Sequence, residues 1–304
     1  MGDTAEGRAS KGGSSDDQVM STARSVDVDG VGIAWYLTGP EVADHRPLLL
    51  VGLPMDASGF ATLSSHFDDR TVITYDPRGA AGSVDGSSAP LSIDTHATDL
   101  RRVLEAADVG VVDVFASSGG AVTMLALLAQ APHLVGTVVL HEPPLTTVLP
   151  DRVAATAVVD EIAAIYRDHG FGPAMAAFIA AGGHLGEFPD GWSPTSGPSA
   201  ADLGLPTDDD GSRDDVMFAR TLYASTGHEP DLEPLAEIAG VIVASGEESQ
   251  GQLMARAAHA LADATGWPHE MFPSHHDGFL GGEFGQHGAP AEFAARLREL
   301  LDGS

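Results

Sequence analysis

The feature that most constrains this chain is the alternation of short apolar runs with helical patterns. The runs that indicate buried strands are Pro47–Val51, Thr71–Tyr75, Val111–Ala116, Gly136–Leu140 and Gly240–Ala244. Short continuous runs of this kind are typical of strands that are covered on both faces of a parallel sheet. The alternation therefore predicts an α/β fold with a mostly parallel, twisted sheet and helices on both of its faces.

Flanking segments extend this pattern. Val31–Leu37 alternates loosely, as a half-exposed strand does, and Glu270–Phe272 is a minimal strand late in the chain. Apolar residues at helical spacing predict the helices, and Ser92 is a suitable N-cap for the first of them. We expect these helices at Ile93–Ala107, Ser118–Gln130, Gln252–Ala264 and Ala289–Leu301.

One long stretch, from Pro144 to about Pro234, breaks the rhythm. It holds two helical segments, Arg152–Tyr166 and Pro173–Ala181, and a middle part rich in proline, glycine and aspartate. We predict a helical cap at residues 144–234, inserted into a core made of residues 25–143 and 235–304. Open α/β sheets bind ligands at the carboxyl ends of their strands, so functional residues are expected there.

Composition excludes several classes of protein. The 304 residues include no cysteine, which excludes disulfides, thiolate nucleophiles and cysteine-ligated metals. The net charge of −29 repels nucleic acid and anionic membranes, so neither is expected as a partner. Genome composition and salt adaptation are both explanations of this acidity.

The first 24 residues are small and polar and lack the apolar core of a signal peptide. We expect them to form a disordered tail. No stretch approaches the about 18 apolar residues of a membrane span. The expectation is a cytoplasmic protein, with a homodimer as one assembly that the sequence allows.

A serine and glycine cluster lies between a predicted strand and a predicted helix. In Ala116-Ser117-Ser118-Gly119-Gly120, small residues stand two positions before and after Ser118, as the tight turn of a nucleophile elbow requires. A register on Ser117 would put Phe115 at the first small position. The helix N-terminus favours negative charge, and the Gly119 N–H is placed to donate to an oxyanion. The alternative is a helix cap without chemistry.

A nucleophilic serine needs a base, and the base needs an acid that orients it. His275 and His276 lie on the loop between the last predicted strand and the final helix, within reach of the elbow. Glu142 ends the strand before the cap, and two prolines that follow it stiffen the chain. Glu248, in the loop after Gly240–Ala244, is the alternative acid.

The ordered motifs resemble the α/β-hydrolase superfamily over roughly residues 26–144 and 235–301. The motifs are GLP at 52–54, DPRG at 76–79, ASSGG at 116–120, HEPP at 141–144 and FPSHHDGF at 272–279. The resemblance selects His276, which falls on the histidine of the F-P-x-x-H-x-G-F pattern. It also puts the usual acid position on Ser249, which cannot serve, and this favours Glu142.

The Ser-Ser-Gly elbow followed by His-Glu-x-Pro also resembles fungal zearalenone lactonases, in which the triad acid is a glutamate at that place. This resemblance implies a triad of Ser118, His276 and Glu142. A cap tryptophan contacts the substrate in those enzymes, and Trp192 is the matching candidate for substrate binding here.

The superfamily resemblance implies two further roles. The second oxyanion donor comes from the loop after Pro47–Val51, where the Leu53 N–H is the first choice and Gly52 the next. Val51 stands where family members usually carry histidine. Arg78, in a stretch that resembles D-x-R-G-x-G-x-S, is expected to be structural and tied to nearby carbonyls or to Asp76.

These assignments predict a serine hydrolase that cleaves a small apolar carboxylic ester or lactone through an acyl-enzyme, with no metal or organic cofactor. The same triad could run acyl transfer or perhydrolysis. The alternative from another class is a non-catalytic ligand-binding member of the fold. A haloalkane dehalogenase or epoxide hydrolase is disfavoured because their nucleophile is an aspartate where this chain has Ser118.

Overall fold

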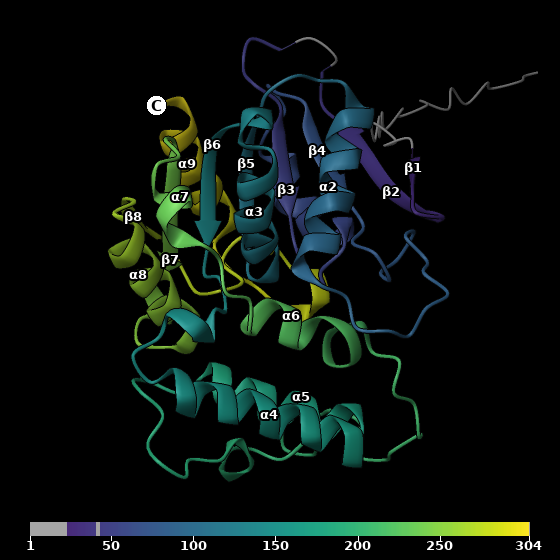
Figure 1. Ribbon diagram of the computed structural model, residues 1–304, viewed down its shortest axis with the longest axis vertical. Coiled ribbons are helices and arrows are strands. Elements are labelled where there is room, and N and C mark those ends of the chain that lie inside the picture. Colours follow the sequence, from purple (N-terminus) through teal and green to yellow (C-terminus); the bar gives the residue numbers. More distant parts are fainter. Residues whose placement is uncertain (1–22, 41–42, 304) are drawn as a thin grey trace, which may run out of the picture.

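A twisted sheet forms the centre of the computed structural model, which describes residues 23–40 and 43–303 (Figure 1). The order of its eight described strands is β1-β2-β4-β3-β5-β6-β7-β8. β1 and β2 form an antiparallel hairpin, β2 is antiparallel to β4, and the remaining neighbours are parallel. The bounds are β1 Arg24–Val28, β2 Val31–Thr38, β3 Leu48–Val51, β4 Val72–Tyr75, β5 Val112–Ser117, β6 Val135–His141, β7 Val241–Gly246 and β8 His269–Phe272.

Helices cover both faces of this sheet, which confirms the predicted fold class. α2 (Ile93–Ala107), α3 (Gly119–Gln130), α7 (Leu232–Ala236) and α8 (Leu253–Thr265) pack on one face. α1 (Ala61–Ser65) and α9 (Pro290–Asp302) pack on the other. Alternate residues of β5 divide between the two cores: Val114 and Ala116 face α3, while Phe115 faces α9.

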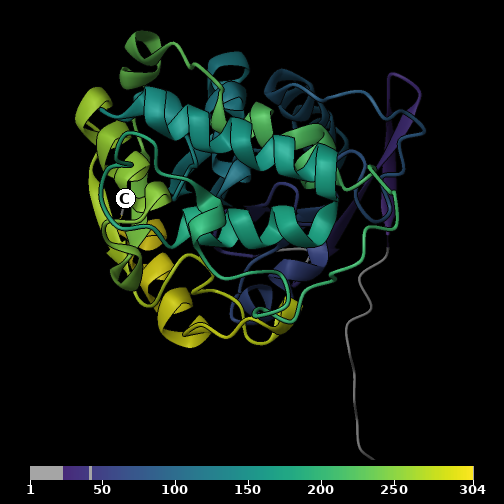
Figure 2. The ribbon, with the colours of Figure 1, turned by 90° about the horizontal axis from the view of Figure 1, so that it is seen from below.

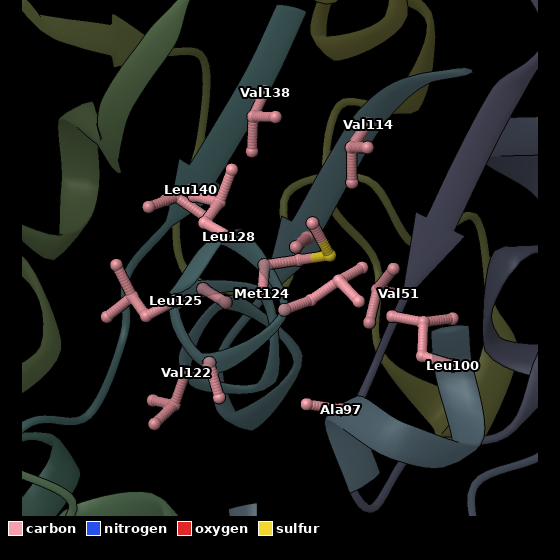
Figure 3. Close-up of a cluster of buried hydrophobic side chains, with 14 of the residues drawn as sticks. Val51, Ala97, Leu100, Val114, Val122, Met124, Leu125, Leu128, Val138 and Leu140 are labelled. Atoms are coloured by element: carbon pink, nitrogen blue, oxygen red, sulfur yellow. The ribbon is translucent and has the colours of Figure 1, made fainter. Parts of the chain in front are cut away.

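The larger core lies between α3 and the central strands, and it fixes the start of α3. Every residue from Gly119 to Leu128 is buried. Burial of each leucine or valine contributes about 1.5–3 kcal/mol to folding. Figure 3 shows how the strand residues Val51, Val114, Val138 and Leu140 meet Val122, Met124, Leu125 and Leu128 of α3, with Ala97 and Leu100 of α2 beside them.

A helical layer lies across the carboxyl ends of the strands (Figures 1 and 2). It consists of α4 (Arg152–His169), α5 (Phe171–Gly182), the π-helix η5 (Met217–Thr221) and α6 (Leu222–Thr226), with its own apolar core. Largely buried ion pairs attach it to the sheet domain: Arg220 bonds Asp85 at 2.6 Å, and Arg256 of α8 bonds Asp151. The short turns are η1 Ala57–Phe60, η2 Pro132–Leu134, η3 Thr146–Val148, η4 Pro194–Ser196, η6 Glu247–Ser249 and η7 Glu283–Gly285.

The element boundaries differ from the expected ones at a few points. Residues 1–22 of the expected tail lie outside the described residues, but Arg24 begins β1, so the tail prediction extends too far. The helix expected from Ser118 begins at Gly119 because the backbone of Ser118 is not helical. α7 spans the expected end of the cap at residue 234. None of the described helices is long and apolar enough to cross a membrane.

Candidate active site

Ser118 lies at the turn between β5 and α3, in a backbone conformation that non-glycine residues rarely adopt. Its φ is 56° and its ψ is −128°. The turn is held because the Ser118 N–H donates to the His141 carbonyl at 2.9 Å and its own carbonyl accepts from Ala121 N–H at 2.9 Å. A strained residue held this firmly is typical of a functional turn. The half-buried serine lines a pocket above the sheet.

The two glycines after Ser118 allow the start of α3 to approach the end of β3 and the loop after it more closely than larger residues would. A Cβ on Gly120 would lie 2.2 Å from the Val51 carbonyl oxygen, and a Cβ on Gly119 would lie 2.6 Å from that of Leu53. The first turn of α3 is therefore pressed against the end of β3. This contact brings the backbone of Gly119 next to the loop that contains Leu53.

The N–H groups of Leu53 and Gly119 form no hydrogen bond within residues 23–40 and 43–303. Both line the same pocket as Ser118. Free backbone N–H groups beside a nucleophile can stabilise the negative charge of a tetrahedral intermediate. The structure thus brings the expected oxyanion donors, Leu53 and Gly119, to one place beside Ser118.

Glu142, after β6, and the half-buried His276, on the loop after β8, form a hydrogen-bonded pair. The Glu142 side chain is fully buried, and its Oε2 accepts from Nδ1 of His276 at 2.6 Å. Its Oε1 accepts from the Gly246 N–H at 2.9 Å. The φ of Glu142 is 48°, another rare conformation for a residue with a side chain. With both oxygens bonded, the carboxylate is held in one orientation.

The electrostatics of this pair favour an ionised carboxylate and an oriented imidazole. Burial alone raises the pKa of Glu142, but the bond from His276, the nearby His141 and the Gly246 N–H together lower it to about 2. Burial alone lowers the pKa of His276, but the bond to Glu142 and its charge raise it above the usual value. A carboxylate can only accept, so Nδ1 of the neutral His276 carries the proton and Nε2 is left to accept one.

The alternatives that the sequence left open lie elsewhere. Nε2 of His275 donates to the His287 carbonyl at 3.3 Å, and its Nδ1 accepts from the Asp277 N–H at 3.1 Å. Glu248 is exposed, and the bond from its N–H to the Ser274 carbonyl is a backbone contact. The structure therefore brings Glu142, and not Glu248, to His276.

The pocket above Ser118 lies between the sheet domain and the helical layer. Its cavity has a volume of about 70 Å³, and none of the described residues that line it is charged. The layer supplies large apolar side chains from α4, α5, η5 and α6, and α8 adds two more. These residues are Val158, Val159, Ile162, Phe178, Met217, Leu222, Leu253 and Met254.

Comparison with known proteins agrees with this architecture. Residues 48–180 match the family model described as the alpha/beta hydrolase fold. The enol-lactonase from Burkholderia xenovorans LB400 superposes with a TM-score of 0.62 at 18% identity, over 92% of this chain and 100% of that one. The proline iminopeptidase of Mycobacterium smegmatis superposes with a TM-score of 0.60 at 18% identity, over 93% and 98%. The chain has the α/β-hydrolase fold.

A sequence relative is the uncharacterized hydrolase YraK of Bacillus subtilis (strain 168). It is 34% identical over 133 residues, which are 41% of this chain and 46% of that protein. The match thus spans about half the length of this relative. As an α/β-hydrolase-fold chain, the protein carries its elbow, Ser118, and its Glu142 inside the matched family region of residues 48–180.

Trp192 is not brought to this pocket. Its ring packs against His184 and Phe188, with ring centroids 4.9 Å apart in each case. It is absent from the described residues that line the pocket beside Ser118. The expected substrate contact therefore lies at the periphery of the helical layer's own core.

Sequence reasoning missed His141, which lies directly behind the pair. It is fully buried, its Nδ1 is 3.2 Å from Ser117 Oγ, and its ring stacks on His276 with centroids 6.0 Å apart. Burial lowers its pKa to about 4, so it is neutral at pH 7. Its place directly before Glu142 in the HEPP motif was the available signal.

His141, Glu142 and His276 also present ligand atoms within 4.8 Å of one another, close enough for a metal ion. Both oxygens of Glu142 are already occupied by His276 Nδ1 and the Gly246 N–H. A cation would have to break the 2.6 Å bond between Glu142 and His276. The arrangement fits a hydrogen-bonded pair better than a set of metal ligands.

Arg78 bonds a backbone carbonyl, as one of the two expectations had it, but its carboxylate partner is Asp99 and not Asp76. It forms a two-pronged ion pair with Asp99 of α2, at 2.6 and 2.8 Å, and donates to the Val28 carbonyl at 3.1 Å. Asp76 instead accepts from the Tyr36 hydroxyl at 2.8 Å and from the Gly82 N–H at 2.9 Å. Asp76 is therefore bonded by β2 and by its own loop, and Arg78 pairs with Asp99 instead.

Proposed function

We propose that this chain is a serine hydrolase that cleaves a carboxylic ester or lactone through an acyl-enzyme. The observation that carries the proposal is the 2.6 Å bond between His276 and the buried Glu142, together with the elbow conformation of Ser118 at φ 56°. In this assignment Ser118 is the nucleophile, His276 the base and Glu142 the acid that orients it. The resemblance of the motifs to zearalenone lactonases supports the same three residues.

The proposed first step is attack of Ser118 Oγ on the scissile carbonyl carbon. The hydroxyl proton passes to Nε2 of His276, and the carbonyl π electrons move onto oxygen, where the N–H groups of Leu53 and Gly119 donate to the oxyanion. Collapse of the intermediate expels the alcohol, which takes the proton from His276. Water then attacks the acyl-enzyme by the same sequence and releases the acid.

Glu142 acts through His276 in this scheme. Its ionised carboxylate, whose pKa is lowered to about 2, stabilises the imidazolium that forms during each proton transfer. Such orientation keeps Nδ1 protonated, so that Nε2 is the basic atom.

The pocket supports a small, uncharged and apolar substrate. Its lining is dominated by aliphatic and thioether side chains, and burial of apolar surface would supply most of the binding free energy. A structural neighbour is described as an enol-lactonase, which supports a lactone, while another is a proline iminopeptidase. The fold itself therefore does not choose the substrate, and the apolar lining is the stronger guide.

A panel of p-nitrophenyl esters and aliphatic lactones tests the proposal. We expect turnover of apolar members, release of the free acid, and loss of turnover by a factor of at least about 10³ in Ser118→Ala. Ser117→Ala is the matched control, because it removes the neighbouring hydroxyl. Turnover that survives Ser118→Ala, or no turnover of any ester or lactone, would contradict the proposal. New esters instead of free acid would reassign the reaction to acyl transfer.

A further inference from the structure

One polar side chain from the helical layer enters the apolar pocket without a partner. Ser225, on α6, is 7% exposed and lines the pocket beside Ser118. Its Oγ forms no hydrogen bond within the part of the chain that the structure describes. Ser225 is buried as a residue, but its Oγ is open to the pocket, where a ligand can supply the missing hydrogen bond.

Neighbouring hydroxyls on the same helical segment behave differently. Thr226 Oγ1 donates to the Leu222 carbonyl at 2.8 Å, and Thr221 Oγ1 donates to the Val216 carbonyl at 3.2 Å. Both are satisfied by the backbone of their own turn, as is common for serine and threonine in helices. Ser225 departs from this behaviour, and its hydroxyl is left to face the pocket.

The hydroxyl lies directly against the elbow. Ser225 Oγ is 2.8 Å from the position that a Cβ on Gly119 would take. Gly119 carries one of the two N–H groups assigned above to the oxyanion. The Ser225 hydroxyl therefore lies next to Gly119, and it reaches this part of the pocket from the helical layer.

The position of Ser225 is fixed relative to the sheet domain. The carbonyl of the next residue, Thr226, accepts from Thr146 Oγ1 at 3.0 Å, and the His228 carbonyl accepts from Thr147 Oγ1 at 2.7 Å. Thr146 and Thr147 follow the HEPP motif that carries Glu142. The end of α6 is thus tied to the turn η3, which follows Glu142 by a few residues, so the hydroxyl is preorganised.

We infer that Ser225 is a third hydrogen-bond donor to the oxyanion, supplied by the helical layer. The inference rests on the proposed function. As Ser118 Oγ bonds to the carbonyl carbon, the π electron pair moves to the carbonyl oxygen, and the Ser225 O–H donates to that oxygen alongside the N–H groups of Leu53 and Gly119. The proton of Ser225 stays on its own oxygen throughout. A donor aimed where charge develops stabilises the transition state more than the bound substrate.

Kinetics of Ser225→Ala on p-nitrophenyl acetate and p-nitrophenyl hexanoate test this role. We expect kcat to fall by about 10- to 100-fold on both esters, with KM changed by less than about threefold, because the bond is made in the transition state. Tyr223→Phe is the matched control. It removes a hydroxyl from the same short helix at an exposed position outside the pocket, and it should leave kcat unchanged.

Benzeneboronic acid provides a second readout that a merely structural role would not move. It forms a tetrahedral anionic adduct with the nucleophilic serine, and its inhibition constant should rise in Ser225→Ala by the factor by which kcat/KM falls. Thermal unfolding of both variants checks that the fold is retained. If the wild type turns over the esters and Ser225→Ala has the same kcat, or differs from the wild type in KM alone, this inference is overturned. If wild type neither turns over esters nor binds the boronate, the proposed function falls and this inference with it.

Discussion

The rare backbone conformations of Ser118 and Glu142 mark the residues on which the site depends. Each has a positive φ, of 56° and 48°, and each directly follows one of two neighbouring strands, β5 and β6. Holding such conformations costs about 1–3 kcal/mol per residue, and they persist where surrounding contacts fix them. Here those contacts are the bond from Ser118 N–H to the His141 carbonyl and the bond from Glu142 N–H to the Ala244 carbonyl.

The pH dependence of Glu142→Gln reports on the pair directly. The base must be neutral, and the bond to Glu142 raises the pKa of His276, so wild-type kcat/KM should rise with pH through a midpoint above about 6.5. Glutamine removes the charge that raises this pKa. We expect a lower midpoint and a kcat that falls by about 10³- to 10⁴-fold, measured on a p-nitrophenyl ester from pH 5 to 9.

Glu248→Gln is the control for this prediction, because the exposed Glu248 does not contact His276. Its pH profile should match that of the wild type. A collapse of kcat in Glu248→Gln, with Glu142→Gln close to wild type, would show that the acid has been misassigned.

At the scale of elements, the decisive contact is between the first turn of α3 and the end of β3. Elementary sterics explain why the elbow is rich in small residues: the Val51 carbonyl lies where a side chain at Gly120 would begin. The apolar face of α3 holds the helix against the sheet, and its N-terminus therefore meets the pocket at a fixed point.

Gly120→Ala should disturb this contact. Its Cβ would lie 2.2 Å from the Val51 carbonyl oxygen, so the backbone must shift. Overpacking of this kind costs about 1–3 kcal/mol, and we expect the midpoint of urea unfolding to fall accordingly, together with kcat. Gly86→Ala is the matched control, because nothing lies within 4 Å of its added methyl. Equal stability of the two variants would refute the steric account of the elbow.

At the scale of the whole molecule, the buried polar groups of the sheet domain make the stability of the fold depend on pH. Besides the Arg78–Asp99 pair, His96 of α2 is fully buried, and neither of its ring nitrogens has a hydrogen-bond partner within the described residues. Burial, with the charges of Arg78 and Arg220, lowers the pKa of His96 to about 4. The native state therefore holds this histidine neutral, while the unfolded chain protonates it near pH 6.5.

His96→Phe should change how stability depends on pH. Because the pKa of His96 is lowered in the native state, protonation favours the unfolded chain. The contribution of His96 to the free energy of unfolding is therefore fully present above pH 6.5. It falls by about 3 kcal/mol in total as the pH drops toward about 4. Phenylalanine does not titrate, so the variant lacks this contribution to the pH dependence of the free energy of unfolding. Urea unfolding at pH 7 and pH 4.5 should show a smaller loss for the variant than for the wild type. An equal loss of stability between pH 7 and pH 4.5 in both proteins would contradict a lowered pKa for His96.

The sequence predicted the elements whose apolar periodicity is strong. The central strands and the helices α2, α3, α8 and α9 fall within a few residues of their expected places, because burial on a sheet imposes those patterns. β1, with the sequence RSVDV, was not predicted as a strand, and its first residue, Arg24, was assigned to the tail, because β1 is polar and pairs only at the sheet edge. Its register depends on β2, which local composition does not reveal.

Residues that meet only in the folded chain escaped prediction. The partner of Arg78 is Asp99, one of many acidic residues in the chain, and the fold alone selects it. Ser225 belongs to a short helix in a segment without clear periodicity. Trp192 was singled out by resemblance, but the path of the chain through the helical layer takes its ring to His184 and Phe188. Motif order predicted Ser118, Glu142 and His276 as candidates because each follows a strand at the same edge of the sheet.

The central claim is that Ser118 is an activated nucleophile, and labelling with a fluorophosphonate probe tests it most directly. The probe phosphonylates a serine hydroxyl whose proton is removed by a neighbouring base. We expect one adduct on intact protein, located at Ser118 by peptide mass spectrometry, absent in Ser118→Ala and strongly slowed in Glu142→Gln. Failure of the wild-type protein to react, or an adduct that persists in Ser118→Ala, would contradict the account.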